Sequence, residues 1–124
     1  MAAEEAVPPQ TFKVIAFCGS LRAASCNAGI VRYAQSVAGK VSLEFTTVDV
    51  SAWPLFNVDD EREGKIPEDI LAAAQLALDC DGVIVASPEY NFSIAPAASN
   101  AVGGSAARSS GLTKGSHCGA RSRA

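Results

Sequence analysis

Residues 12–27 read FKVIAFCGSLRAASCN, an apolar run that leads directly into a polar loop. The run from Phe12 to Phe17 is short, nearly unbroken and contains β-branched residues, which is typical of a strand buried on both faces of a parallel sheet. The carboxyl ends of such strands open into the crevice where α/β sheets bind ligands. The sequence therefore predicts a buried strand whose following loop lies at a ligand site.

The loop after this strand is rich in hydrogen-bond donors. Its candidate binding residues are Gly19, Ser20, Arg22, Ser25 and Asn27. Glycine permits a tight bend, the serine and asparagine side chains donate, and arginine is permanently charged. The helix expected next would direct free N–H groups and its positive dipole end to the same place. We interpret the loop as a phosphate site; a turn that only caps the helix is the alternative.

Two common nucleotide loops are excluded by inspection. The chain has no Gly-Lys-Ser/Thr of a P-loop. The dinucleotide fingerprint requires three glycines, and this loop has only Gly19. The loop therefore favours a mononucleotide held by hydroxyl groups.

Length and composition indicate one small domain. The chain has 124 residues, 48% of them hydrophobic, and no segment approaches the roughly 18 apolar residues of a membrane helix. Residues 1–10, expected to be flexible, contain no Lys or Arg and so resemble neither a secretory signal nor a transit peptide. Residues 1–100 hold all 13 acidic side chains. We expect a cytoplasmic protein that does not bind nucleic acid.

Cysteine and histidine usage excludes several catalytic schemes. The four cysteines form no CxxC pair or zinc-like spacing, and the single histidine, His117, lies near the C-terminus. No metal site is expected. A Ser-His-Asp or Cys-His hydrolase is excluded from the body of the chain, so its chemistry would have to come from a cofactor.

Hydrophobic periodicity predicts alternating strands and helices after the loop. The expected elements are a helix from Ala28 to Ala38, a strand from Ser42 to Val50, a long loop from Ser51 to Lys65, a helix from Pro67 to Asp79 and a buried strand from Gly82 to Ser87. The order βαβαβ implies a parallel sheet with right-handed crossovers.

The last of these strands leads into a second candidate loop, Ser87 to Pro96. In a doubly wound sheet of order 2-1-3, strands one and three are neighbours, so the two loops would open side by side. Tyr90 and Phe92 could pack against a planar ring, and Asn91 could hydrogen-bond its edge. The alternative is that both aromatic side chains are buried under a helix.

These two loops together resemble the NADPH-dependent FMN reductase family, and within it the plant-type NAD(P)H:quinone oxidoreductases. The similarity covers about residues 12–102 and depends on Gly19-Ser20-Leu21-Arg22 with Ser25 and Asn27, and on Pro88-Glu89-Tyr90-Asn91-Phe92-Ser93-Ile94. The two motifs agree with the family in order and spacing.

The resemblance implies a flavodoxin-like α/β fold, non-covalently bound FMN and hydride transfer from NAD(P)H through the flavin to a quinone. It implies that Ser20, Arg22, Ser25 and Asn27 hold the FMN phosphate, with Gly19 at the bend. The isoalloxazine ring would be lined by Pro88, Glu89, Tyr90 and Asn91. It also implies homo-oligomers. A flavodoxin-type electron carrier is a further alternative, but the two motifs resemble those of the reductases more closely.

The family pattern ends near residue 100. Residues 103–124 form a low-complexity Gly/Ser/Ala/Arg segment whose composition predicts disorder, which leaves residues 11–102 as a partial domain with an incomplete, three-stranded sheet. We interpret the chain as truncated or frame-altered, with a free apolar edge at Val83 to Ala86. Two hypotheses follow: an FMN-dependent oxidoreductase, or a non-catalytic fragment that binds FMN weakly or pairs with full-length subunits.

Overall fold

A parallel β-sheet with helices on both faces forms the body of the protein. The computed structural model describes residues 9–107. Its elements in chain order are β1 (Phe12–Cys18), α1 (Cys26–Ala38), β2 (Leu43–Val48), α2 (Val58–Arg62), α3 (Glu68–Asp79), β3 (Gly82–Ala86), β4 (Glu89–Tyr90), β5 (Ser93–Ile94) and α4 (Pro96–Ala107).

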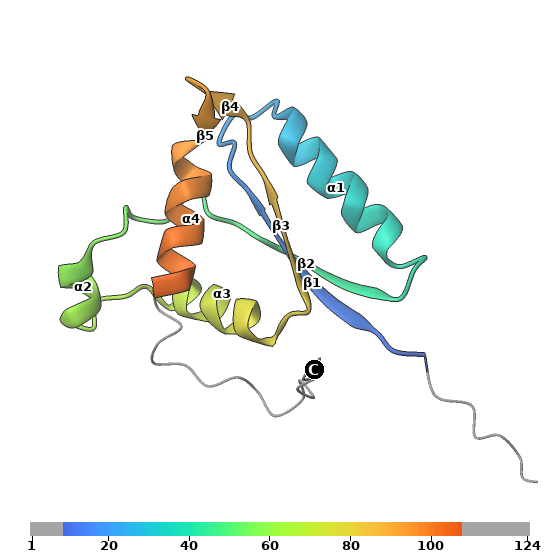
Figure 1. Cartoon of the computed structure of the whole chain (residues 1–124), viewed down its shortest axis with the longest axis horizontal. Coiled ribbons are helices and arrows are strands. Elements are labelled where there is room, and N and C mark those ends of the chain that lie inside the picture. The colour runs from blue at the N-terminus through green and yellow to red at the C-terminus, as the bar shows by residue number, and fades with distance from the viewer. Residues whose placement is uncertain (1–8, 108–124) are drawn as a thin grey trace, which may run out of the picture.

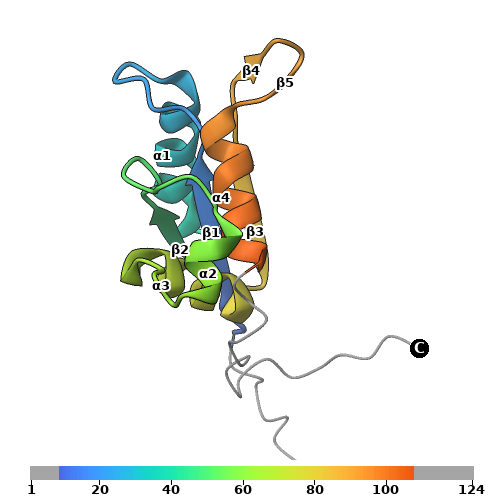
Figure 2. The same ribbon diagram turned by 90° about the vertical axis from the view of Figure 1, so that its left-hand side faces the viewer.

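The sheet has the order β2-β1-β3, and both pairings are parallel. Phe17 of β1 lies opposite Val48 of β2 and Val85 of β3, so all three strands end at the same edge of the sheet. Helix α1 covers one face, and helices α3 and α4 cover the other (Figures 1 and 2). The predicted flavodoxin-like arrangement, with strand order 2-1-3, is confirmed.

The core lies on both sides of β1, because successive side chains of a strand point to opposite faces. Ile15 and Phe17 pack with Val50 and with Ala101 of α4. Ala16 points the other way and packs with Val31 of α1 and Ala86 of β3. The central strand is therefore buried on both faces, as its sequence predicts.

Strand β3 differs from this prediction. The sequence indicates a buried run, but Val83, Ile84 and Val85 are 52%, 38% and 42% exposed. The reason is position: β3 is the last strand of the described sheet and has a neighbour on one side only.

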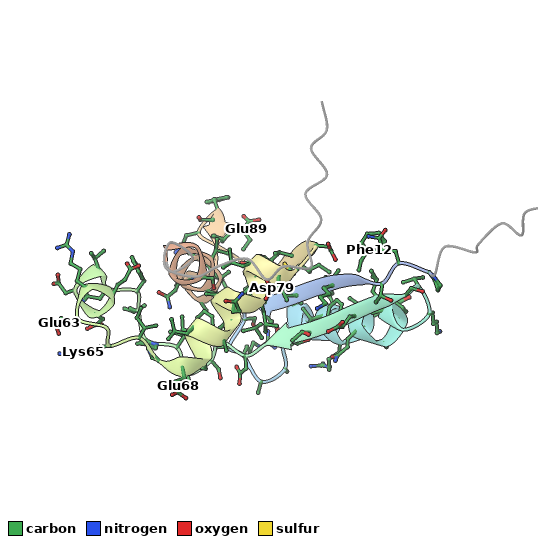
Figure 3. All side chains as sticks on the ribbon, turned by 90° about the horizontal axis from the view of Figure 1, so that it is seen from below. Phe12, Glu63, Lys65, Glu68, Asp79 and Glu89 are labelled. Carbon is green, nitrogen blue, oxygen red and sulfur yellow. The ribbon has the colours of Figure 1, made fainter. Side chains whose placement is uncertain are left out.

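The predicted loop Ser51 to Lys65 contains a short helix, α2. The Asn57 side chain accepts a hydrogen bond from the N–H of Asp59 at 3.0 Å and caps this helix, which buries no residue. The Glu63–Lys65 ion pair follows it, at the outside of the molecule (Figure 3). Because α2 lacks an apolar stripe, periodicity gives no signal for it.

Two further differences lie after β3. The predicted loop Ser87 to Pro96 contains the antiparallel hairpin β4–β5. Helix α4 then continues to Ala107, so residues 103–107 of the predicted low-complexity segment are helical. Residues 1–8 and 108–124, which include most of the predicted flexible N-terminus and most of the low-complexity segment, lie outside the described residues.

Candidate functional site

The predicted phosphate loop joins β1 to α1 at the carboxyl edge of the sheet. Its first residue, Gly19, is buried, and its N–H donates to the carbonyl oxygen of Ala86 at 2.8 Å. This bond joins the start of the loop to the end of β3, from which the second predicted loop leaves. Figures 1 and 2 show that the first loop and the β4–β5 hairpin rise from the same end of the molecule.

Gly19 also allows α4 to approach the loop closely. A Cβ atom at position 19 would lie 2.5 Å from the Cβ of Ala98 and 3.1 Å from both its Cα and its N. These atoms belong to a short side chain and to helix backbone, so they cannot rotate away. The glycine is required here for packing.

The start of α1 combines capping with free donors. Ser25 is 7% exposed, and its hydroxyl accepts from the N–H of Ala28 at 3.1 Å while its carbonyl accepts from Gly29 at 3.2 Å. The N–H groups of Cys26 and Asn27 have no acceptor among residues 9–107. The capping interpretation is thus correct for Ser25, and the same turn leaves two backbone donors at the positive end of the helix dipole.

A substitution at Ser25 tests its capping role separately from anion binding at the start of α1. We expect Ser25→Ala to lower the free energy of unfolding by about 1 kcal/mol, because the N–H of Ala28 loses its partner. Urea unfolding of the variant measures this. Ser36→Ala, which removes an exposed serine near the end of the same helix, is the control and is expected to change stability by less than about 0.5 kcal/mol. Equal effects at both positions would contradict a capping role.

A cavity of about 270 Å³ lies between the loop and the end of β2. Its loop side includes Cys18, Ser20 and Arg22, and its other wall is formed by residues 47–51. Arg22 is exposed and makes no ion pair within the described part of the chain. Ser25 and Asn27 are not in the lining of this cavity. The exposed cation of Arg22 favours an anionic group on the loop side of the cavity.

Asp49 places a negatively charged carboxylate in the opposite wall of the cavity. The N–H of Ser51 donates to its carboxylate at 2.9 Å, which holds the pKa of Asp49 below its ordinary value and keeps the group ionised at neutral pH. An ionised carboxylate accepts hydrogen bonds from hydroxyl groups and repels phosphate. This wall is not predicted from the sequence, although the Asp-Val-Ser turn at the end of the predicted second strand is a usable signal.

The second predicted loop is held at its base by Ser87. The Ser87 hydroxyl donates to the carbonyl of Pro88 and accepts from the N–H of Ala95, both at 2.9 Å. The hairpin above it turns at Asn91 and Phe92, whose φ angles of 51° and 62° match a type I′ turn. This turn fixes the direction of the segment that contains Pro88 to Asn91.

The aromatic residues of this hairpin are exposed. Tyr90 is 51% and Phe92 98% exposed, so burial under a helix, the alternative considered above, is wrong. Glu89 lies at the outside of the molecule (Figure 3). The four residues Pro88 to Asn91 do not line the cavity beside Arg22. The structure therefore gathers Ser20 and Arg22 around one cavity and places the hairpin residues apart, at the same end of the sheet.

Comparison with known proteins decides the family. Residues 12–104 match the family described as NADPH-dependent FMN reductase. The chain belongs to this family. An NADPH:quinone oxidoreductase from Arabidopsis thaliana is 38% identical over 107 residues, which cover 82% of this chain and 53% of that protein. A quinone reductase from Escherichia coli is 30% identical, covering 75% of this chain and 50% of that protein.

Solved structures agree with this FMN reductase assignment. FerB, a flavoenzyme NAD(P)H:(acceptor) oxidoreductase from Paracoccus denitrificans, has a TM-score of 0.64 and 27% identity, covering 76% of this chain and 50% of that chain. The chain spans about half the length of the relatives that it matches.

Two negative findings concern only the described residues. Residues 9–107 contain no group of three or more His, Cys, Asp or Glu side chains placed to hold a metal ion. No helix in this part of the chain is long and apolar enough to cross a membrane.

Proposed function

We propose that the protein is an FMN-dependent oxidoreductase that transfers hydride from NAD(P)H, through bound FMN, to a quinone. The observation that carries this proposal is the loop before α1, where Arg22 and Ser20 line a cavity and the N–H groups of Cys26 and Asn27 have no acceptor among the described residues. Family membership and the activities for which the relatives are named support it.

The residues present fit an FMN group. Gly19 supplies the close approach to α4, and Ser20 and Arg22 line the cavity where the phosphate would bind. In this proposal Ser25 and Asn27, at the start of α1, would complete the phosphate site. Because Asp49 is ionised and lines the same cavity, it would accept hydrogen bonds from the hydroxyl groups of the ribityl chain. Pro88, Glu89, Tyr90 and Asn91, at the same end of the sheet, would line the flavin ring.

The protein's part in this chemistry is binding and positioning. Bound FMN supplies the acceptor and donor of hydride, and no protein acid or base is needed for that transfer. Arg22 neutralises phosphate charge through charge-assisted hydrogen bonds. The Tyr90 side chain is 51% exposed, so it is accessible to a nicotinamide or a quinone.

The proposal extends to partners and location. We place the protein in the cytoplasm, where NAD(P)H is supplied and where free thiols such as those of Cys18, Cys26 and Cys80 stay reduced. The acidic body makes nucleic acid an unfavourable partner. The working form is a homo-oligomer.

Two measurements on the purified full chain test the function. The first is FMN released on denaturation, detected by its fluorescence, and the second is NAD(P)H oxidation that depends on an added quinone. The oxidoreductase hypothesis requires both signals. FMN without turnover would support the non-catalytic fragment instead, and absence of FMN after reconstitution would contradict the oxidoreductase hypothesis.

Arg22→Ala is the sharpest variant for the phosphate site. We expect it to weaken FMN binding by roughly tenfold to a hundredfold, because one charged hydrogen-bonding group is lost. Titration of the apoprotein with FMN measures this, and the loss should shrink at high salt. Arg32→Ala removes an exposed arginine from α1 and is the matched control. A similar loss in both variants would show that only the overall charge matters.

A further inference from the structure

We propose that Asn100 of α4 is a positioning residue for FMN binding, a role that rests on the function proposed above. The Asn100 side chain accepts a hydrogen bond from the N–H of Phe56 at 2.7 Å and donates to the carbonyl of Pro54 at 3.0 Å. These bonds join α4 to a segment that lies 44 to 46 residues earlier in the chain. That segment follows the wall of the cavity that contains Asp49, and Asn100 holds this wall in place.

Both polar groups of the Asn100 amide are used in this contact. In an extended segment, the carbonyl of one residue and the N–H of the residue two places later point to the same side. The amide therefore binds Pro54 and Phe56 as the peptide group of a neighbouring strand would. Two such bonds fix the direction of the segment as well as its position, because a paired contact adds geometric specificity.

The segment held by Asn100 continues directly from the cavity wall. Asp49 and Ser51 line the cavity, and the N–H of Ser51 donates to the Asp49 carboxylate. The N–H of Trp53 then donates to the carbonyl of Val50 at 3.2 Å, which closes the turn. The next residue, Pro54, has its φ angle fixed by its ring. Because little rotational freedom is left between them, a displacement of Pro54 also moves the Asp49 carboxylate.

The same part of α4 also contacts the opposite wall of the cavity. Ala98 lies against Gly19, which stands between two residues that line the loop side. Ala101 belongs to one core cluster with Val50, which lines the other side. Asn100 lies between these two alanines in the chain. One turn of α4 therefore touches both walls and sets their separation, and Asn100 is its polar attachment to the β2 side.

Asn100→Ala tests this role by titration of the apoprotein with FMN. We expect the dissociation constant to rise about tenfold, because the Asp49 wall is no longer held in the binding geometry. The helix itself is not weakened, since alanine has a higher helix propensity than asparagine, and circular dichroism verifies the fold. Asn57→Ala is the matched control. It removes an asparagine that caps α2 from the same loop, and it should change the dissociation constant by less than about twofold.

A second background separates positioning from a general loss of structure. In the Asp49→Ala variant, the group that Asn100 positions is absent. Adding Asn100→Ala should then raise the dissociation constant by less than about threefold more, because the two substitutions remove the same interaction with FMN. A general loss of structure would weaken binding by the same factor in both backgrounds.

Hydrogen exchange in the wild-type chain measures the same coupling without a substitution. The N–H groups of Phe56 and Asp59 are each bound by an asparagine side chain, and neither residue lines the cavity. Coupling between two sites is reciprocal, so bound FMN should slow exchange at the Phe56 amide at least about threefold more than at the Asp59 amide.

Three results would overturn the positioning role of Asn100. These are equal FMN binding by the wild-type and Asn100→Ala chains, equal losses in the two backgrounds, and equal slowing of exchange at the two amides. In each of them the wild-type chain binds FMN, so the proposed function stands. A wild-type chain that binds no FMN would contradict the proposed function and the role of Asn100 together.

Discussion

Gly19→Ala is expected to lower the free energy of unfolding by about 1–3 kcal/mol, the usual cost of inserting a methyl group into a packed region. The new Cβ would meet the Cβ of Ala98 at 2.5 Å, so either the loop or α4 must move. Because the loop begins the proposed phosphate site, the same movement should weaken FMN binding at least about tenfold. Urea unfolding and FMN titration measure the two effects.

A second substitution tests whether this one contact is the cause. Ala98→Gly removes the atom that the new Cβ would strike, at a cost of about 1 kcal/mol in helix propensity. The double variant should lose less free energy of unfolding than the sum of the losses in the two single variants. Gly39→Ala is the control: its φ of −63° suits any residue, and nothing lies within 4 Å of an added Cβ. Strict additivity of Gly19→Ala and Ala98→Gly would contradict the packing explanation.

Ile15→Ala is expected to have the largest effect on folding, a loss of about 2–5 kcal/mol. Ile15 is 2% exposed at the centre of β1 and packs with Phe17, Val50 and Ala101, so its removal leaves a cavity in the main core. Small domains have total stabilities of about 5–15 kcal/mol, and this chain could lose much of its own. Urea unfolding monitored by circular dichroism gives the value.

An isoleucine at the surface provides the comparison. Ile30 lies on α1 and is 60% exposed, so Ile30→Ala should change the free energy of unfolding by less than about 0.5 kcal/mol. Ile15→Val, which removes one methyl group, should cost about 0.5–1.5 kcal/mol. If Ile15→Ala cost no more than Ile30→Ala, the assignment of β1 as the buried central strand would be wrong.

The elements predicted from the sequence are those with a strong apolar pattern. β1 and the main helices have buried stripes, and the alternation of strands with helices is enough to imply the parallel order that the sheet adopts. Helix α2 was missed because it buries nothing. The hairpin was missed because its strands are two residues long and its turn uses Asn91-Phe92 in place of the usual Asn-Gly.

The candidate site was predictable only where one loop supplies the residues. The donors after β1 are contiguous in sequence, so Ser20 and Arg22 could be named directly. Asp49 lies at the same cavity because β2 pairs with β1. No local sequence pattern predicts this pairing. The contact between Gly19 and Ala98 joins residues far apart in the chain and likewise depends on the tertiary structure.

Trp53 is the only tryptophan of the chain, and its ring lies edge-on to Phe17 with 6.3 Å between centroids. Its indole Nε1 is buried without a hydrogen-bond partner among the described residues. Its ultraviolet emission therefore reports on the interior at one known point, close to where β1 passes into the ligand loop. Occupancy of that loop by a flavin should quench this emission by resonance energy transfer, so an unlabelled sample can follow folding and cofactor uptake together.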